Sequence, residues 1–287
     1  MVTEFPKMSL CDDAMTIVVQ YCDHGTFYNL LQVNHVSNEL TKETILYKEL
    51  WEYRHNLSFL SVLKKGSLLL TKYFYNPREK SGSFTFSCFY GHLEISKWFY
   101  SIGNIDIHIR NEEAFRNSCT HGHYEVAKWL YSLGLTTTKE KSIEEVDIHA
   151  ENEEAFRNCC KNGHFEIAKW LYSLENVKIH VINEEAFRSS CCNGYLNIAK
   201  WLYSLGNVNV NIGNYNAFRH CCRRGHIEVA KWIYSLGYIN IYSEEEYAFS
   251  SSYKNGHWEI SKWLLSLYDE SHKKNINPNV MRNLVGL

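Results

Sequence analysis

The sequence is poor in the features that mark nucleic-acid-binding and membrane proteins. Its 30 lysines and arginines do not outnumber its 32 aspartates and glutamates, so there is no excess of positive charge to neutralise phosphates. The longest nearly apolar segment, residues 57–70, is broken by Lys64, Lys65 and Gly66. The N-terminus, MVTEFPKMSLCDD, lacks the basic and then apolar order of a signal peptide. These absences predict a soluble intracellular protein that binds neither nucleic acid nor membrane.

Cysteine pairs of the form C-x-x-C, which typify zinc sites, are also absent. The ten cysteines are spread over 287 residues, and six of them form doublets at residues 159–160, 191–192 and 221–222. Adjacent cysteines rarely bridge one another, and an intracellular chain keeps its thiols reduced. Because cysteine is among the most readily buried residues, the sequence predicts small core residues instead of disulfides.

Internal repetition is what the sequence has in abundance. A marker glycine recurs in steps of 31 residues, with one step of 41, at Gly91, Gly122, Gly163, Gly194, Gly225 and Gly256. A phenylalanine stands seven residues before each glycine, and a Lys-Trp pair places its tryptophan seven residues after it. The chain therefore contains six copies of one unit, and residues 135–144 are an insertion expected to loop out between the second and third copies.

Each unit predicts two short helices. Asn111, Asn152 and Asn183 stand where an N-cap would accept a free backbone N–H, and the Glu-Glu pairs after them suit the positive end of a helix dipole. The Ala, Phe and small Ser or Cys positions recur at helical spacing and predict a buried stripe, while the glycine can end the first helix in the left-handed conformation. In the second helix, an Ile or Val, an Ala or Ser and the Trp-Leu pair form the apolar face. We therefore expect an all-α chain.

These residues resemble the ankyrin repeat, whose pattern runs T-P-L-H-x-A-A-x-x-G-H-x-E-V-V-K-x-L-L-x-x-G-A. Phe156 falls at the family's Leu, Cys159-Cys160 at its paired alanines and Gly163-His164 at its Gly-His. Over residues 82–270 the chain departs from the pattern in three ways: Glu-Glu replaces Thr-Pro, arginine replaces the following His, and the period is 31 instead of about 33 residues. The resemblance implies an ankyrin-repeat solenoid, and the phrase K-W-L-Y-S-L looks like the arrays that giant DNA viruses encode.

Repetition also bears on whether the histidines and cysteines form a chemical site. Equivalent side chains lie one stacking step apart, about 8–10 Å for packed helices, whereas a metal or catalytic site needs them to converge on one point. His123, His164, His226 and His257 are therefore expected to form a ladder that satisfies backbone groups near the turn between helices. No nucleophile with a base and no phosphate-cradling loop stands out. The sequence thus predicts neither an enzyme nor a cofactor or metal site.

The two ends of the chain differ from the repeats. Residues 56–81 keep the frame of the unit but are followed by a connector six residues too short, which predicts a degenerate capping repeat. Residues 271–287 are expected to form a polar capping helix or a frayed tail. Residues 1–55 do not fit the repeat and predict three short amphipathic helices.

The order of these three helices resembles the F-box, in which L-P-x-E-x-x-x-x-I-L-x-x-L precedes a Leu-rich helix ending in V-S/C-K-x-W/F and a closing L-W. The matching residues are Leu10, Asp13, Val18, Val19 and Cys22, then Leu30, Leu31, Val36 and Ser37, then Leu50 and Trp51. Cys11 replaces the family's usual Pro, and Leu40 stands near the expected aromatic. The resemblance implies docking of the Skp adaptor of a cullin-RING ubiquitin ligase through Leu10, Val18, Leu30 and Val36. The alternative is a helical cap that shields the first repeat.

Together the two resemblances imply a non-catalytic substrate adaptor, in which the F-box recruits the ligase and the ankyrin array captures a protein target. The alternative is a plain ankyrin scaffold or inhibitory decoy. Connector tips and the exposed side of the first helices form the binding surface of such solenoids. On this chain they predict the target-binding residues Arg110, Lys178, Asn209, Tyr215, Tyr238, Tyr242 and Tyr247, although a tyrosine at a tip can equally cover a neighbouring repeat. We expect a monomer without cofactors, located in the cytoplasm, and in a host cell if the chain is viral.

Overall fold

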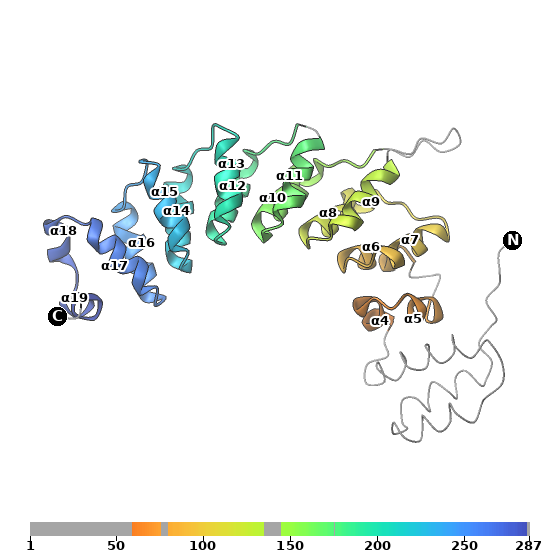
Figure 1. Cartoon of the computed structure of the whole chain (residues 1–287), viewed down its shortest axis with the longest axis horizontal. Coiled ribbons are helices and arrows are strands. Elements are labelled where there is room, and N and C mark those ends of the chain that lie inside the picture. The colour runs from red at the N-terminus through yellow and green to blue at the C-terminus, as the bar shows by residue number, and fades with distance from the viewer. Residues whose placement is uncertain (1–58, 76–79, 135–144, 175, 286–287) are drawn as a thin grey trace, which may run out of the picture. The chain divides into compact units, whose positions relative to one another are not determined.

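The computed structural model describes residues 59–75, 80–134, 145–174 and 176–285, and the regular elements of these ranges are helices (Figure 1). The chain divides into two compact units, Met1–Asp106 and Ile107–Leu287. The F-box-like residues, with Leu10, Val18, Leu30 and Val36 among them, lie outside the described ranges. The insertion at residues 135–144 lies outside them as well.

The first unit contains α4 (Phe59–Lys65), α5 (Leu68–Tyr73), α6 (Lys80–Phe89) and α7 (Leu93–Ser101). The side chain of Ser67 caps α5 by accepting a hydrogen bond from the backbone N–H of Leu70 at 3.1 Å. The ring of His92 donates from Nε2 to the carbonyl of Lys64 at 3.0 Å, which ties the second pair of helices to the first. The buried apolar residues are Val62, Leu63, Leu70, Phe84, Cys88, Ile95 and Phe99.

The second unit is a row of helix pairs. Its helices are α8 (Ile109–Thr120), α9 (Tyr124–Gly134), α10 (Ala150–Asn162), α11 (Phe165–Leu174), α12 (Val181–Cys192), α13 (Leu196–Ser204), α14 (Ile212–Arg224), α15 (Ile227–Ser235), α16 (Ser243–Lys254), α17 (Trp258–Leu267), α18 (Glu270–Asn275) and α19 (Pro278–Val285). The first helices α8, α10, α12, α14 and α16 pack on one another in chain order, and each also packs on the second helix of its own pair (Figure 1).

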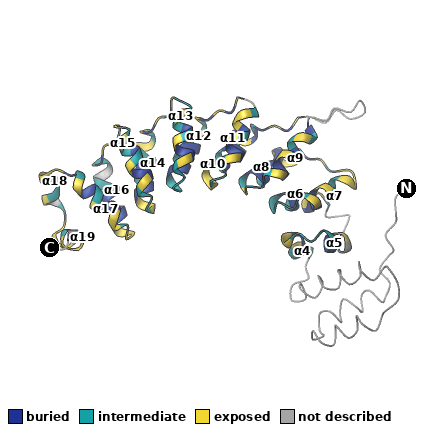
Figure 2. Cartoon of the chain, in the orientation of Figure 1, coloured by how far each residue is buried: buried dark blue, intermediate teal, exposed yellow. Residues whose placement is uncertain are grey.

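The core of this unit repeats with the sequence. Phe115, Phe156, Phe187 and Phe218 each have only 1% of their surface exposed, and the alanines of the second helices are fully buried. Buried residues lie along the helix sides that face other helices, and exposed residues lie on the outside (Figure 2). Burying one such side chain contributes about 1.5–3 kcal/mol. The predicted buried stripe is therefore confirmed, and it links each repeat to the next.

The glycine at the end of the first helix α8 is required for two reasons. Gly122 has a φ of 83°, the left-handed region that L side chains rarely adopt. A Cβ at this position would also lie 2.6 Å from Cε1 of His164 in the next repeat. The glycine thus both ends α8 and leaves room for the histidine that follows it in the stack, and the predicted left-handed helix end is confirmed.

The beginnings of the first helices differ from the N-cap prediction. The φ angles of Glu151, Asn152 and Glu153 are 54°, 56° and 62°, so a left-handed turn precedes the right-handed helix. The same turn occurs at residues 110–112 and 182–184. Asn111, Asn152 and Asn183 lie inside this turn, and the N-cap positions are His108, His149 and His180, without a side-chain cap bond. The N-cap prediction for these three asparagines is therefore wrong.

Candidate functional site

The histidine ladder serves the backbone, as its spacing predicts. Nε2 of His164 donates to the carbonyl of Thr120 in the preceding repeat at 3.1 Å. Burial lowers the pKa of His164, and the hydrogen bond to Thr120 opposes this shift. A neutral imidazole has one ring N–H, which is enough to donate to that carbonyl. A histidine of the ladder can therefore link its repeat to the preceding one.

The eight cysteines in the described ranges are free thiols, and all of them except Cys192 are buried. Sγ of Cys159 donates to the carbonyl of Cys119 at 3.2 Å. Burial raises the pKa of Cys88 to about 12 and that of Cys192 to about 11, and it raises the pKa of Cys221 well above its usual value. Because the thiolate is the reactive form, these thiols are poor nucleophiles and poor metal ligands near neutral pH.

The described residues contain no group of three His, Cys, Asp or Glu side chains that could hold a metal ion. None of the helices in the described ranges combines the length and the apolar character needed to span a bilayer.

The two glutamates of each Glu-Glu pair have different roles. The first one, Glu153, is only 2% exposed, accepts a hydrogen bond from Nδ1 of His149 at 2.8 Å and accepts another from the backbone N–H of Lys178 at 3.2 Å. Lys178 belongs to the connector that leads into the next repeat. The same bridge recurs from Glu112 to the N–H of Asp147 and from Glu184 to the N–H of Asn209. A buried carboxylate therefore fixes the backbone of each of these connectors.

In the pairs at residues 153–154 and 184–185, the second glutamate joins neighbouring first helices. Arg116 pairs with Glu154 of the next repeat, and Arg157 pairs with Glu185 of the one after. Each arginine also donates to carbonyls of its own left-handed turn, as Arg157 does to Asn152 at 2.8 Å. The arginine that replaces the ankyrin histidine thus holds the turn that replaces the ankyrin Thr-Pro. This arrangement was not predicted from the sequence, although its residues recur at the fixed spacing H-x-x-x-E-E-x-x-R.

Four of the predicted target-binding residues lie on connectors or helix starts with exposed side chains. Arg110, Lys178 and Asn209 are exposed, and Tyr238 is 56% exposed. Asn209 and Tyr238 come together around a surface hollow of about 370 Å³ that residues 206–211 also line. Arg110 and Lys178 belong to other repeats and do not line this hollow.

The other three predicted residues are half-buried tyrosines. Tyr215 lies in the left-handed turn of α14, with a φ of 61°. Tyr242 stacks on His272 with ring centroids 3.8 Å apart and lies 5.2 Å from Tyr268, so it covers the C-terminal end of the array. The ring of Tyr247 lies under the guanidinium of Arg219, 5.2 Å from its centroid. Tyr242 is therefore engaged within the chain, whereas Tyr247 belongs to a charged part of the surface.

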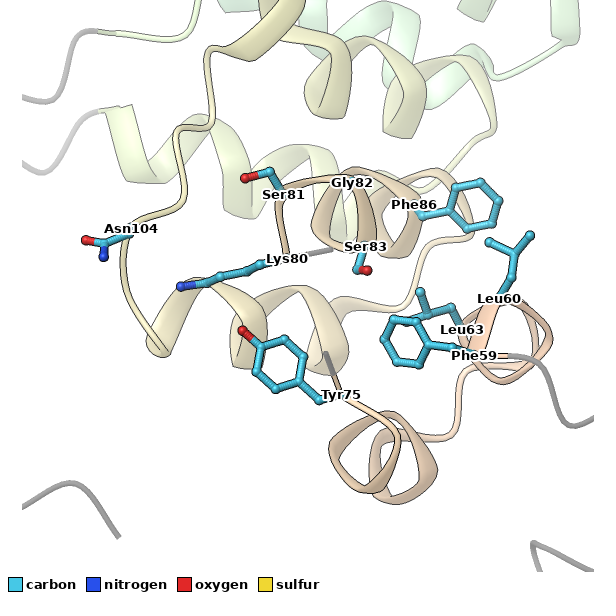
Figure 3. A pocket seen from close by; sticks show the side chains of 10 residues that line it. All are labelled: Phe59, Leu60, Leu63, Tyr75, Lys80, Ser81, Gly82, Ser83, Phe86 and Asn104. Atoms are coloured by element: carbon cyan, nitrogen blue, oxygen red, sulfur yellow. The ribbon is translucent and has the colours of Figure 1, made fainter. Parts of the chain in front are cut away.

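A larger open pocket, of about 850 Å³, lies in the first unit. Phe59, Leu60, Leu63 and Phe86 gather on one side of it, and Lys80 lies toward the other (Figure 3). Leu60 is 55% exposed. The lining offers no acid–base pair, so this pocket provides an apolar surface and no evident chemistry.

Comparison with known proteins identifies the repeated architecture. Residues 156–245 match the family model of ankyrin repeats, in three copies. These residues contain ankyrin repeats. An X-ray structure of an ankyrin repeat family protein from Legionella pneumophila matches at 14% identity, over 88% of this chain and 86% of that chain, with a TM-score of 0.36. The comparison with curated proteins gives no match.

The predicted fold class, an all-α ankyrin-repeat solenoid, is confirmed for the described residues. Ankyrin repeats imply a role in binding other proteins. In this array, buried glutamates of the preceding repeat hold the backbone of three connectors, at Asp147, Lys178 and Asn209.

Proposed function

We propose that this chain is a non-catalytic binding protein whose ankyrin connectors and first helices hold a protein target. The observation that carries this proposal is the bridge from each buried glutamate to the next connector, as from Glu153 to the N–H of Lys178. A loop fixed before binding loses less conformational entropy on association than a mobile one. The exposed side chains of Lys178 and Asn209 are then presented from a backbone that these bridges hold, and Tyr238 lies beside Asn209 around the same surface hollow.

A photo-crosslinking amino acid at Tyr238 tests this surface. It should label a defined protein in cell extract, and the same probe at Lys200, which is exposed on the second helix α13, should not. Equal labelling from both positions would contradict a binding surface on the connectors.

We further propose that residues 1–55 dock the Skp adaptor of a cullin-RING ubiquitin ligase, so that the captured target is presented for ubiquitin transfer. The support is the F-box-like order of three apolar segments that closes with Leu50-Trp51. The likeness of K-W-L-Y-S-L to viral arrays would place this ligase in a host cell. The second candidate function is a plain ankyrin scaffold or decoy, in which the same helices only cap the stack.

A double substitution in the full chain, Leu10→Asp with Val36→Asp, separates these two functions. In an adaptor, it should abolish Skp binding in a pull-down and leave the melting temperature of the array unchanged, because the apolar surface awaits a partner. In a cap, the new carboxylates would lie against the first repeat and lower the melting temperature, because an unpaired buried charge is costly. Failure of the wild-type chain to bind any Skp adaptor would end the F-box proposal.

A further inference from the structure

The first helix α14 differs in charge from the other first helices of the second unit. Its sequence, IGNYNAFRHCCRR, carries three arginines and no carboxylate. The helices α8, α10, α12 and α16 each contain at least two glutamates. The whole chain has a net charge of -2. Positive charge is therefore concentrated locally on an otherwise slightly acidic protein.

The ladder of arginine–glutamate pairs stops where this helix begins. Arg116 and Arg157 are each paired with a glutamate of the next repeat, Glu154 and Glu185. The equivalent position of α14 is Asn216. Within the described part of the chain, Arg188 donates to the carbonyls of Asn183 and Ile182 and pairs with no carboxylate. Its charge is thus left uncompensated by the ladder.

His220 lies on α14 beside Arg219, Arg223 and Arg224, and α14 packs on α12, which carries Arg188. Burial lowers the pKa of His220, and the charges of Arg223, Arg219, Arg224 and Arg188 lower it further. Arg224 and Arg188 also act together on Cys192, where both oppose the rise in pKa that burial causes. Arg188 of α12 and Arg224 of α14 thus both lie near His220 and Cys192, and because α12 packs on α14, the arginines of these two helices form one cluster.

An aromatic ring borders the cluster. Tyr247 lies under Arg219, and its hydroxyl accepts a hydrogen bond from Arg223 at 3.5 Å. Arg224 has a structural role as well, because it donates to the carbonyl of Cys192 at 3.3 Å and to the side chain of Asn193. Arg223 is exposed, as is Arg224.

We propose that this arginine cluster, formed by Arg188, Arg219, Arg223 and Arg224 with Tyr247 beside it, binds an acidic segment of the captured protein. The inference rests on the proposed function and names the chemistry of the partner. Guanidinium groups bind carboxylates through paired hydrogen bonds, and an adjacent ring adds apolar contact. The cluster spans two adjacent repeats on a chain of net charge -2, whereas nucleic acid needs a longer basic track along its phosphates. A short acidic peptide matches this size.

A labelled peptide of glutamate and aspartate tests the proposal by fluorescence anisotropy with the full chain. Its neutral counterpart of glutamine and asparagine should not bind. The variant Arg219→Gln with Arg223→Gln should weaken binding about tenfold or more, and binding by the wild type should weaken as salt is raised. Lys200→Gln with Lys231→Gln removes the same charge from the second helices α13 and α15 and should leave binding unchanged.

A third variant tests the break in the ladder. Asn216→Glu places a glutamate where Glu154 and Glu185 stand, so it should pair with Arg188 and weaken peptide binding without lowering the melting temperature. Absence of peptide binding, or equal loss in the lysine control, would overturn the proposal. If single-stranded RNA binds equally tightly and the same arginine variant loses this binding, the proposal that the partner is an acidic protein segment is wrong. If the peptide does not bind while the probe at Tyr238 still labels a protein, the proposed protein-binding function is retained and only the acidic ligand of the arginine cluster is rejected.

Discussion

At the scale of single residues, Glu153 joins two parts of the fold that lie far apart in sequence. Its carboxylate accepts from His149 within the same repeat and from the N–H of Lys178 in the next connector. Glu153→Ala would leave that N–H without its acceptor, and we expect a loss of about 1–3 kcal/mol in the free energy of unfolding, measured with urea. Glu153→Gln keeps one acceptor oxygen and should lose less than half as much. Equal stability of the alanine variant would show that the connector does not depend on this bridge.

The roles of such residues could be predicted only in part. The pattern located the Glu-Glu pairs and the arginines, and it correctly predicted buried cysteines and a histidine ladder from their spacing. From the N-cap pattern, both glutamates were predicted to interact with the helix dipole. That pattern applies only where the backbone is right-handed from the first residue of the helix. The structure has a left-handed turn at Glu151, Asn152 and Glu153 instead. This turn costs about 1–2 kcal/mol per residue, which the bonds from Arg157 offset.

At the scale of helices, the tryptophans of α11, α13, α15 and α17 connect neighbouring repeats. Trp170 of α11 packs edge to face on Tyr124 and Tyr131 of α9, with ring centroids 5.5 and 5.7 Å apart. It lies 6.3 Å from Phe115 of α8. Trp201 makes the equivalent contacts one repeat later. The apolar face of the second helix was predicted correctly, but the tryptophan is only half-buried, because its ring lies at the edge of the stack while Leu171 fills the centre.

Trp170→Ala should therefore cost less than loss of a fully buried aromatic. We expect about 2–3 kcal/mol in the free energy of unfolding, below the ~3–5 kcal/mol of a core tryptophan. Trp258 is the matched control: it is 50% exposed and contacts Tyr253 of its own repeat, so Trp258→Ala should cost less than about 1 kcal/mol. Circular dichroism with denaturant measures both. Equal losses would mean that contacts between repeats contribute nothing beyond burial.

At the scale of the whole molecule, each repeat of the second unit is stabilised by its neighbours, so the ends of the array are its weakest points. The sequence predicted the repeats because six copies repeat one pattern in register. It left two possibilities for residues 271–287, because a single copy gives no pattern to compare. The compact units divide at Asp106 and Ile107, within a connector of the repeats, and the boundaries at residues 55 and 81 stay predictions.

The C-terminal residues provide the test at this scale. Leu284 of α19 is 2% exposed and α19 packs on α17, while His272 of α18 stacks on Tyr242. Deleting residues 270–287 would uncover both contacts, so amide hydrogen exchange in α16 and α17 should become about tenfold faster, equivalent to ~1.4 kcal/mol of local stability. Exchange in α10 and α12 should hardly change, because stability in a repeat stack passes mainly between neighbours. Leu284→Ala in the full chain should give a smaller change in α17. Unchanged exchange in α16 and α17 would show that residues 270–287 are a tail and that the last full repeat ends the array without a cap.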